Sequence, residues 1–115
     1  MASAFKNLGA ILGISDGVSA IHYTVPANTI AVIHAVYISN LSSTLSLFAN
    51  VQVTTDGGTT FYYVGKGLEV VPNNTMVLDK PINLENNDKL KVWVDPLVDS
   101  SLPSASVFAS ILEIS

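Results

Sequence analysis

Short stretches of strand-forming residues, separated by turn residues about every ten positions, run through nearly the whole of this chain. The one stretch with a trace of helical period, residues 4–12, is interrupted by Gly9, which weakens a helix interior. Closely spaced strands without helices are typical of sandwiches and barrels. The sequence therefore predicts an all-β fold, an antiparallel β-sandwich of about eight strands with a jelly-roll-like arrangement.

Two nearly identical pentapeptides mark where strands should end. "VPANT" begins at Val25 and "VPNNT" begins at Val71. In each copy an apolar strand ends at the valine, and the proline stops the pairing because it has no N–H to donate. The residues that follow tolerate a turn, and the threonine opens the next strand. We expect two equivalent corners that join strands, as in a sandwich built from two Greek keys.

The remaining strands are predicted from alternation and from turn residues. Residues 30–38 are apolar on both faces, which predicts a central strand covered on both sides. The segment "GKG" at 65–67 is interpreted as a bend between two strands, because it lacks the spacing of a phosphate loop. The expected strands are 18–25, 30–38, 44–54, 59–64, 68–71, 76–78, 90–94 and 105–114.

The composition points to assembly. The chain is 49% hydrophobic and only 12% charged, against a usual charged share of about 25%. So few charges cannot cover the surface of an ordinary monomer, so we expect other protein to cover part of the exterior. At 115 residues the chain is predicted to be one domain, 1–115, with residues 1–17 as a candidate N-terminal arm.

Several classes of function are disfavoured by what the composition lacks. The chain has no arginine, and scattered lysines on a net charge of −4 offer no phosphate-binding patch, so we expect no nucleic-acid partner. No run approaches the roughly 20 apolar residues of a membrane helix, and "LGAILGI" at 8–14 is short for a secretory leader. The absence of cysteine excludes disulfides and thiolate chemistry.

No catalytic, cofactor-binding or metal-binding residue is assigned, and the chain is predicted not to be an enzyme. His34 lies in the most apolar strand, so a buried, hydrogen-bonded histidine is favoured over a ligand, and His22 has no carboxylate at ligand spacing. A calcium cluster of Asp88, Asp95 and Asp99 is the alternative, although no EF-hand-like run is present.

Outward-facing aromatic residues are the candidate protein interface. Alternation in "KLKVWVD" points Trp93 away from the core, and Phe48 alternates with a core face in the same way. Within "FYY", at least one of Tyr62, Tyr63 and their neighbouring phenylalanine must face outward. Protein contact is the favoured interpretation, and a carbohydrate-stacking platform is the alternative. Glu113 is expected in water at a strand end, or against a lysine of another subunit.

Five segments of the chain form a recognisable pattern of corners and turns from Ile21 to the end. They are "IHYTVPANTIAVIHAVYISN", "DGGTTFYYV", "VVPNNTMVL", "INLENNDKLKVWV" and "SILEIS". Together these segments resemble small virion proteins of tailed bacteriophages. Asn87 stands where that pattern usually has a glycine before an aspartate.

The resemblance implies a non-enzymatic, jelly-roll-like subunit located in the virion, with no cofactor. A capsid decoration (cement) protein is the first expectation, and a tail, neck or fibre-associated protein is the alternative. The implied partners are other copies of the chain, with a trimer as one option, and the major capsid protein or tail proteins. The resemblance assigns no catalytic residues.

Overall fold

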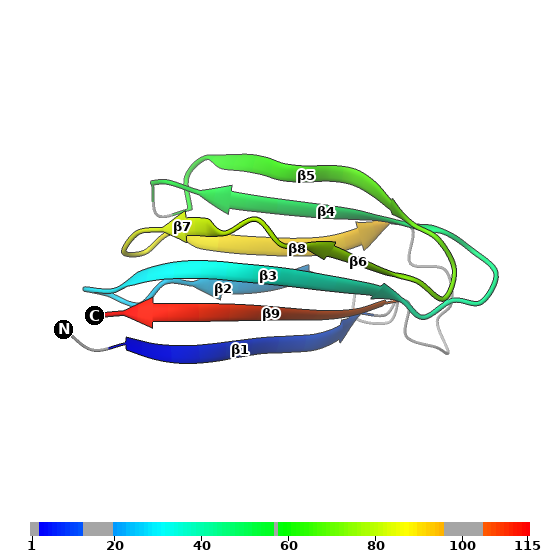
Figure 1. Ribbon diagram of the computed structural model, residues 1–115. Helices are drawn as coiled ribbons and strands as arrows, with labels where there is room; N and C mark the ends of the chain where they lie inside the picture. Colours follow the sequence, from blue (N-terminus) through cyan, green and yellow to red (C-terminus); the bar gives the residue numbers. More distant parts are fainter. Residues whose placement is uncertain (1–2, 13–19, 57, 96–104) are drawn as a thin grey trace.

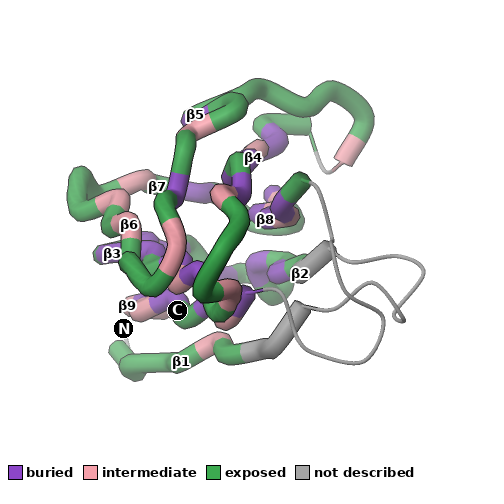
Figure 2. Tube along the Cα trace, turned by 90° about the vertical axis from the view of Figure 1, so that its right-hand side faces the viewer, coloured by how far each residue is buried: buried purple, intermediate pink, exposed green. Residues whose placement is uncertain are grey.

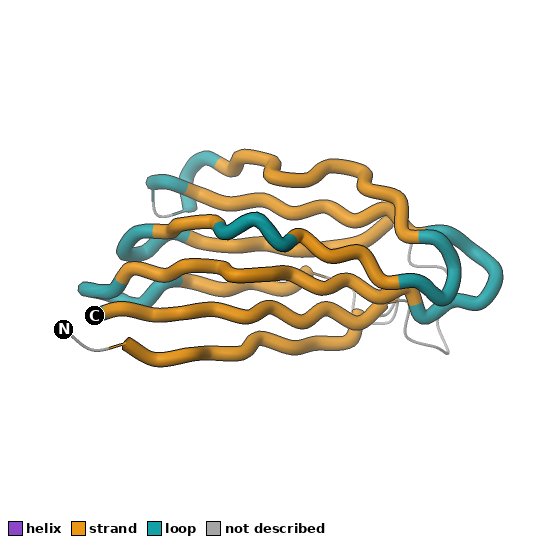
Figure 3. Tube along the Cα trace, viewed as in Figure 1, coloured by secondary structure: helices purple, strands orange, loops and turns teal. Residues whose placement is uncertain are grey.

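The chain folds into two antiparallel sheets packed face to face. The computed structural model describes residues 3–12, 20–56, 58–95 and 105–115, and this part contains strands and no helix (Figures 1 and 3). Sheet A has the order β1-β9-β3-β6, with β7 also paired to β3, and sheet B has the order β2-β8-β4-β5. The strands are β1 (Ser3–Leu12), β2 (Ala20–Thr24), β3 (Ile30–Asn40), β4 (Leu47–Thr54), β5 (Phe61–Val70), β6 (Thr75–Leu78), β7 (Ile82–Leu84), β8 (Lys89–Asp95) and β9 (Ala105–Ile114).

β6 and β7 together occupy a single position in sheet A. β6 pairs with Val36–Ser39 of β3, and β7 pairs with Ala31–Ile33 of the same strand. The sequence did not predict β7, because Pro81 interrupts this edge of the sheet and leaves a strand of only 3 residues. The sandwich therefore has four strand positions in each sheet, which confirms the predicted jelly-roll-like β-sandwich.

The core lies between the two sheets and is filled by alternate side chains of each strand. Figure 2 shows the buried segments gathered between the layers, with exposed segments outside. Each such aliphatic side chain contributes about 1.5–3 kcal/mol through burial. The largest fully buried side chains are Ile33, Ile38, Leu47, Leu90, Ile111, Val25, Val36, Val51, Val92, Val94 and Thr54.

Each pentapeptide is a corner that carries the chain from sheet B to sheet A, as predicted, but the two corners are not equivalent. In the first corner Asn28 has a φ of 59°, and Val25 is fully buried. The Val25 N–H donates to the Asp88 carbonyl at 2.9 Å, and the Val25 carbonyl accepts from Asn87 at 3.1 Å. The first corner is therefore held by the turn between β7 and β8.

The second corner contains a turn of its own and is also bonded to the end of β3 and the residues after it, since the Asn73 N–H donates to the Ser42 carbonyl at 3.1 Å and the Asn74 carbonyl accepts from the Asn40 N–H at 2.8 Å. The Asn74 N–H donates to the Val71 carbonyl at 3.2 Å, and the positive φ, 62°, belongs to Asn73. Proline at the second position and a left-handed residue at the third make this a type II turn. Val71 is 44% exposed, whereas its counterpart in the first corner is buried. The two nearly identical pentapeptides therefore adopt different backbone conformations, and the predicted equivalence of the two corners is wrong.

Two further segments differ from their predictions. Residues 3–12 form the edge strand β1, which pairs with β9 from Ser3↔Ile114 to Leu12↔Ala105. The predicted bend at 65–67 lies inside one continuous strand, because the register between β4 and β5 shifts twice and leaves a bulge there. Gly67 has a φ of 61°, which glycine adopts at little cost, and its N–H donates to the Asn50 side-chain carbonyl at 3.0 Å.

Candidate protein-binding faces

Trp93 and Tyr63, two of the predicted interface residues, meet on the outer side of sheet B. The β8 pattern alternates as predicted, with Leu90, Val92 and Val94 buried and Trp93 half-buried on the opposite side. Tyr63 comes from β5, and its ring centroid lies 6.1 Å from that of Trp93. Both strands flank β4, so the two rings come together above that strand.

Lysine side chains lie over these rings. The Lys91 ammonium is 5.0 Å from the Trp93 ring centroid and 5.8 Å from that of Phe61, and the Lys66 ammonium is 5.2 Å from that of Tyr63. Such cation–π contacts contribute about 0.5–1 kcal/mol each at exposed sites. We call the outer side of sheet B the charged face. Its outward residues include Phe48, Phe61, Tyr63, Lys66, Glu69, Lys89, Lys91, Trp93 and Asp95.

The charges of this face are separated along the strands. Lys89 and Lys91 lie at the start of β8, Asp95 lies at its end, and Lys66, in the bulge of β5, lies between them, between the rows of Val92 and Val94. Asp95 pairs with Phe48, which pairs in turn with Glu69, so one row joins the two carboxylates with an aromatic ring between them. The distance from Lys89 to Asp95 along the strand is about 20 Å at 3.3 Å per residue. The charged face therefore has a basic end and an acidic end.

Asn50 fixes the middle of the charged face. Its side-chain amide donates to the Asp95 carboxylate at 3.2 Å, and its carbonyl accepts from Gly67 in the bulge of β5. This side chain is buried, so its hydrogen bonds are protected from water. The Asn50 amide therefore holds two features in place: the bulge that positions Lys66, and the Asp95 carboxylate at the acidic end. This role has no local signal in the sequence, because it depends on a register shift between β4 and β5.

The outer side of sheet A, which we call the apolar face, is exposed and carries no charged residue. Register places Phe108 beside Tyr37, with ring centroids 6.3 Å apart, and Phe5 beside Leu112. Phe5 is 81% exposed, Phe108 is 43% exposed and Tyr37 is 40% exposed. None of the outward positions described in β1, β3, β6, β7 and β9 is Asp, Glu, Lys or Arg.

His34 lies exposed on the apolar face, so the prediction of a buried histidine is wrong. The register shifts between Ile33 and Ala35, and this bulge leaves His34 without a paired position. Its ring lies 6.4 Å from that of Phe5. The prediction that β3 is covered on both sides is likewise not met within one chain, since Ile30 on its outer side is exposed.

The structure separates the remaining predicted interface residues. Phe48 lies on the charged face at its acidic end. Tyr62 is exposed on the opposite side of β5 from Tyr63, so it does not join the Trp93 cluster. Phe5, Tyr37 and Phe108 were not among the predicted interface residues. Alternation in 105–114 was the signal that could have identified Phe108.

The acidic residues of the calcium alternative do not come together. Asp88 and Asp95 lie at opposite ends of β8, and Asp99 lies outside the described residues. Asp88 is buried, and its carboxylate accepts from the Glu85 N–H at 3.0 Å, which is a turn-forming role. Within the described ranges, no group of three His, Cys, Asp or Glu residues could hold a metal ion.

A hydrogen bond between Tyr23 and Glu113 links the two sheets. The Tyr23 hydroxyl of β2 donates to the Glu113 carboxylate of β9 at 2.5 Å. Burial raises the pKa of Tyr23 above its usual value, and the hydrogen bond to the carboxylate and its negative charge raise it further. The Lys6 ammonium lies 3.9 Å from the same carboxylate. Glu113 therefore meets a lysine of its own chain, and neither predicted environment for it is correct.

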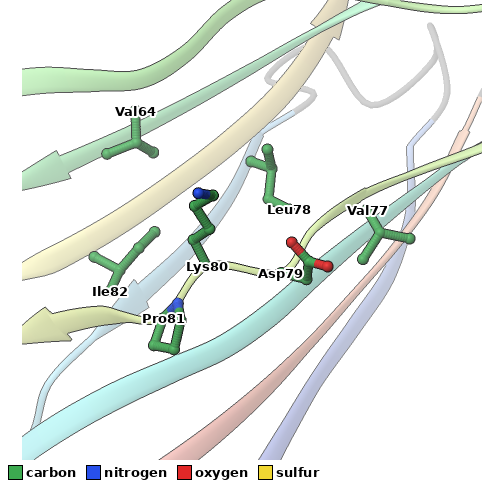
Figure 4. Close-up of a pocket in the computed structure, with 7 residues that line it drawn as sticks. All are labelled: Val64, Val77, Leu78, Asp79, Lys80, Pro81 and Ile82. Carbon is green, nitrogen blue, oxygen red and sulfur yellow. The ribbon is translucent and has the colours of Figure 1, made fainter.

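A shallow cavity of about 280 Å³ opens between β5 and the interrupted edge formed by β6 and β7 (Figure 4). Its walls are mainly aliphatic, and its polar side chains are Asp79 and Lys80. None of its described lining residues is a histidine or carries a hydroxyl group. The lining residues are Val64, Val77, Leu78, Asp79, Lys80, Pro81 and Ile82.

Among the residues that the structure describes, no helix is long and apolar enough to cross a membrane.

Comparison with known proteins identifies the fold only. No protein-family model matches the chain, and no curated protein matches its sequence. The core of Drosophila NLP, a structure described in terms of pentamer formation and histone binding, aligns with a TM-score of 0.52 and 11% identity. The alignment covers 96% of this chain and 98% of that one.

Viral capsid structures are also among the similar folds. A chain of the T13 infectious bursal disease virus particle aligns with a TM-score of 0.52 and 13% identity over 96% of this chain. The aligned region is 30% of that viral chain, so this protein spans less than a third of its length. A pentameric capsid protein from metagenomic phage sequences aligns over 79% of this chain at 14% identity, with a TM-score of 0.38 that supports no inference. One fold thus occurs in proteins with different partners.

Proposed function

We propose that this protein is a non-enzymatic structural component of a phage virion, and specifically a capsid decoration (cement) protein. In this proposal it associates with copies of itself and binds a larger lattice such as the major capsid protein. It acts by burying complementary surface between neighbouring proteins, without chemistry.

The observation that carries the proposal is the apolar face. Exposed Phe5, Tyr37 and Phe108 lie on a side of the sandwich whose described outward positions carry no charge. Large uncharged apolar surfaces are uncommon on soluble monomers and mark sites that another protein covers. The low charge content of the whole chain, 12%, supports the same conclusion.

The proposed mechanism is stabilisation by mass action. A protein that binds only the assembled lattice shifts the equilibrium toward that assembly, and the effect grows with the ratio of its concentration to its dissociation constant. Many copies around a symmetric shell add avidity, so each contact can be weak. The similarity of the fold to a viral particle chain is compatible with this role, and the similarity to a pentameric protein is compatible with self-association.

A carbohydrate platform receives less support from the geometry. Sugars stack on the open face of an aromatic ring, and lysine ammonium groups lie 5.0 Å from the Trp93 ring centroid and 5.2 Å from that of Tyr63. An enzyme also receives little support, because His22 and His34 lie on the outer sides of different sheets.

Immunogold electron microscopy tests the proposal. Antibodies against the purified chain are applied to particles of the virus that encodes it, and particles of a virus lacking the gene serve as control. Label over the head, absent from the control, is the expected result. Label confined to the tail would replace decoration with the tail or fibre alternative. Particles without label would contradict a virion role.

A further inference from the structure

We propose that the charged face binds the same face of a second copy of this chain, with the strands of the two copies antiparallel. The two-fold axis lies between the two faces and runs across the strands. This inference rests on the self-association in the proposed function and identifies the surface responsible. It leaves the apolar face free for the lattice.

The first support is the separation of charge along the face. Lys89 and Lys91 form its basic end, and Asp95 and Glu69 form its acidic end, about 20 Å away. A flat, uniformly acidic partner would be attracted to one end and repelled from the other. A complementary surface has acidic groups opposite Lys89 and Lys91 and basic groups opposite Asp95 and Glu69. A second copy whose strands run antiparallel to those of the first supplies that surface.

The charges also select the direction of the two-fold axis. An axis parallel to the strands would place the acidic end of each copy, with Asp95 and Glu69, over the acidic end of the other, so like charges would meet. An axis across the strands places the basic end of each copy over the acidic end of the other. Opposite charges at an interface fix orientation and suppress wrong pairings, and like charges in contact cost several kcal/mol.

The aromatic residues occupy the part of the face that such a pairing buries most deeply. Trp93 lies between the two charged ends on β8, and its ring contacts that of Tyr63, which comes from the row of Lys91 on β5. Tryptophan and tyrosine near the centre of an interface supply most of the binding free energy when the surrounding contacts exclude water. The lysine stems that lie over these rings add apolar surface to the same centre.

Two lysines of the face, Lys66 and Lys91, are available for contacts with another molecule, whereas the Lys89 ammonium donates to the Thr24 hydroxyl at 3.3 Å. The ion pair in the described part of the chain joins Lys6 to Glu113, and neither Lys66 nor Lys91 is paired with a described carboxylate. Their contacts within the chain are to aromatic rings, which leaves the ammonium hydrogen-bond donors for a carboxylate of the second copy.

Charge reversal combined with sedimentation equilibrium tests the proposal. We expect the wild type to form a dimer, and we expect Lys91→Glu, Asp95→Lys and Glu69→Lys each to raise its dissociation constant at least tenfold. The double variant Lys91→Glu/Asp95→Lys exchanges the charges at the two ends of β8, which this pairing places opposite each other, so its dissociation constant should return to within about threefold of wild type.

Lys80→Glu is the matched control, because Lys80 is exposed in the connection between β6 and β7, away from the charged face. It changes net charge by the same amount and should leave the dimer unchanged. Far-UV circular dichroism checks the fold of every variant. If Lys91→Glu fails to fold, Glu69→Lys still tests the proposal, since no side-chain hydrogen bond of Glu69 is present in the described structure.

Three outcomes would overturn the proposal: a wild type that stays monomeric at about 100 μM, single reversals that leave the dimer unchanged, or a double variant weaker than both singles. Immunogold labelling of particles does not depend on any of these results. Labelled particles together with a failed charge swap would reject the two-fold pairing and retain the virion role.

Discussion

The two outer faces of the sandwich expose similar numbers of aromatic side chains and differ in how they carry charge. On sheet A, Phe5, Tyr37 and Phe108 lie among serine, asparagine and aliphatic residues. On sheet B, Trp93 lies between a basic end and an acidic end, and Tyr63 lies beside it in the row of Lys91. An uncharged surface attracts apolar partners without fixing their orientation, whereas a surface with two charged ends accepts a partner in one direction.

This difference shows that apolar exposure alone does not identify a partner. Both faces are hydrophobic enough to be protein contact surfaces, because each exposes aromatic rings to water. Only the charge pattern distinguishes a face suited to a copy of itself from a face suited to a large apolar lattice.

Replacing Trp93 by glutamate should abolish the dimer. The charge would lie at the centre of the charged face, where the second copy removes water, and the aromatic contact with Tyr63 would be lost. We expect the dissociation constant to rise at least a hundredfold, about 2.7 kcal/mol, as measured by sedimentation equilibrium. Circular dichroism should be unchanged, since Trp93 lies outside the core. A variant dimer of wild-type affinity would exclude Trp93 from the interface.

Salt should affect the two faces in opposite directions. Raising NaCl from about 50 mM to about 500 mM shortens the screening length and weakens the contacts between charged ends, so the dimer should weaken about tenfold. Binding of an apolar dye such as bis-ANS to the apolar face should stay constant or increase. A dimer that tightens with salt would instead be held by apolar contact alone, and the apolar face would become its site.

Replacing Tyr23 by phenylalanine should lower the free energy of unfolding by about 1 kcal/mol, because the hydrogen bond to Glu113 joins the two sheets. Urea unfolding followed by circular dichroism measures this change. Neither outer face contains the bond, so the dimer dissociation constant should not move. A weakened dimer would show that the two faces are coupled through the core.

Replacing Phe108 by glutamate should leave the dimer within about twofold of wild type, because Phe108 lies on the apolar face. Bis-ANS binding should fall to about half, since a charge would interrupt the contact between Phe108 and Tyr37. Titration of the dye against the dimeric protein measures the effect. Loss of the dimer in this variant would transfer self-association to sheet A.

Local alternation was sufficient to predict much of the fold. The period of two in β8 and β4 placed Trp93 and Phe48 outside the core, and the Val-Pro pentapeptides placed the corners. The local sequence of each pentapeptide could not distinguish the two corners. Val25 is buried and hydrogen-bonded to the β7–β8 turn, and Val71 is exposed, because each corner meets a different neighbour in space.

The residues that the sequence analysis misjudged depend on register. His34 sits at a bulge in β3, and Lys66 sits at a bulge in β5 that Asn50 stabilises from the neighbouring strand. A bulge changes which side a residue faces, and it is determined by the partner strand. The separation of charge on the charged face follows from the order of strands in sheet B. Alternation within a single strand could not predict it.

Emission from Trp93, the only tryptophan, tests the pairing of charged faces most directly. Dilution of the wild-type protein is followed by fluorescence and by sedimentation equilibrium over the same concentrations. We expect the emission maximum to move to the red as the dimer dissociates, with the same midpoint as the mass, because dissociation returns Trp93 to water. An emission maximum that stays constant while the mass falls by half would place the interface elsewhere and contradict the account.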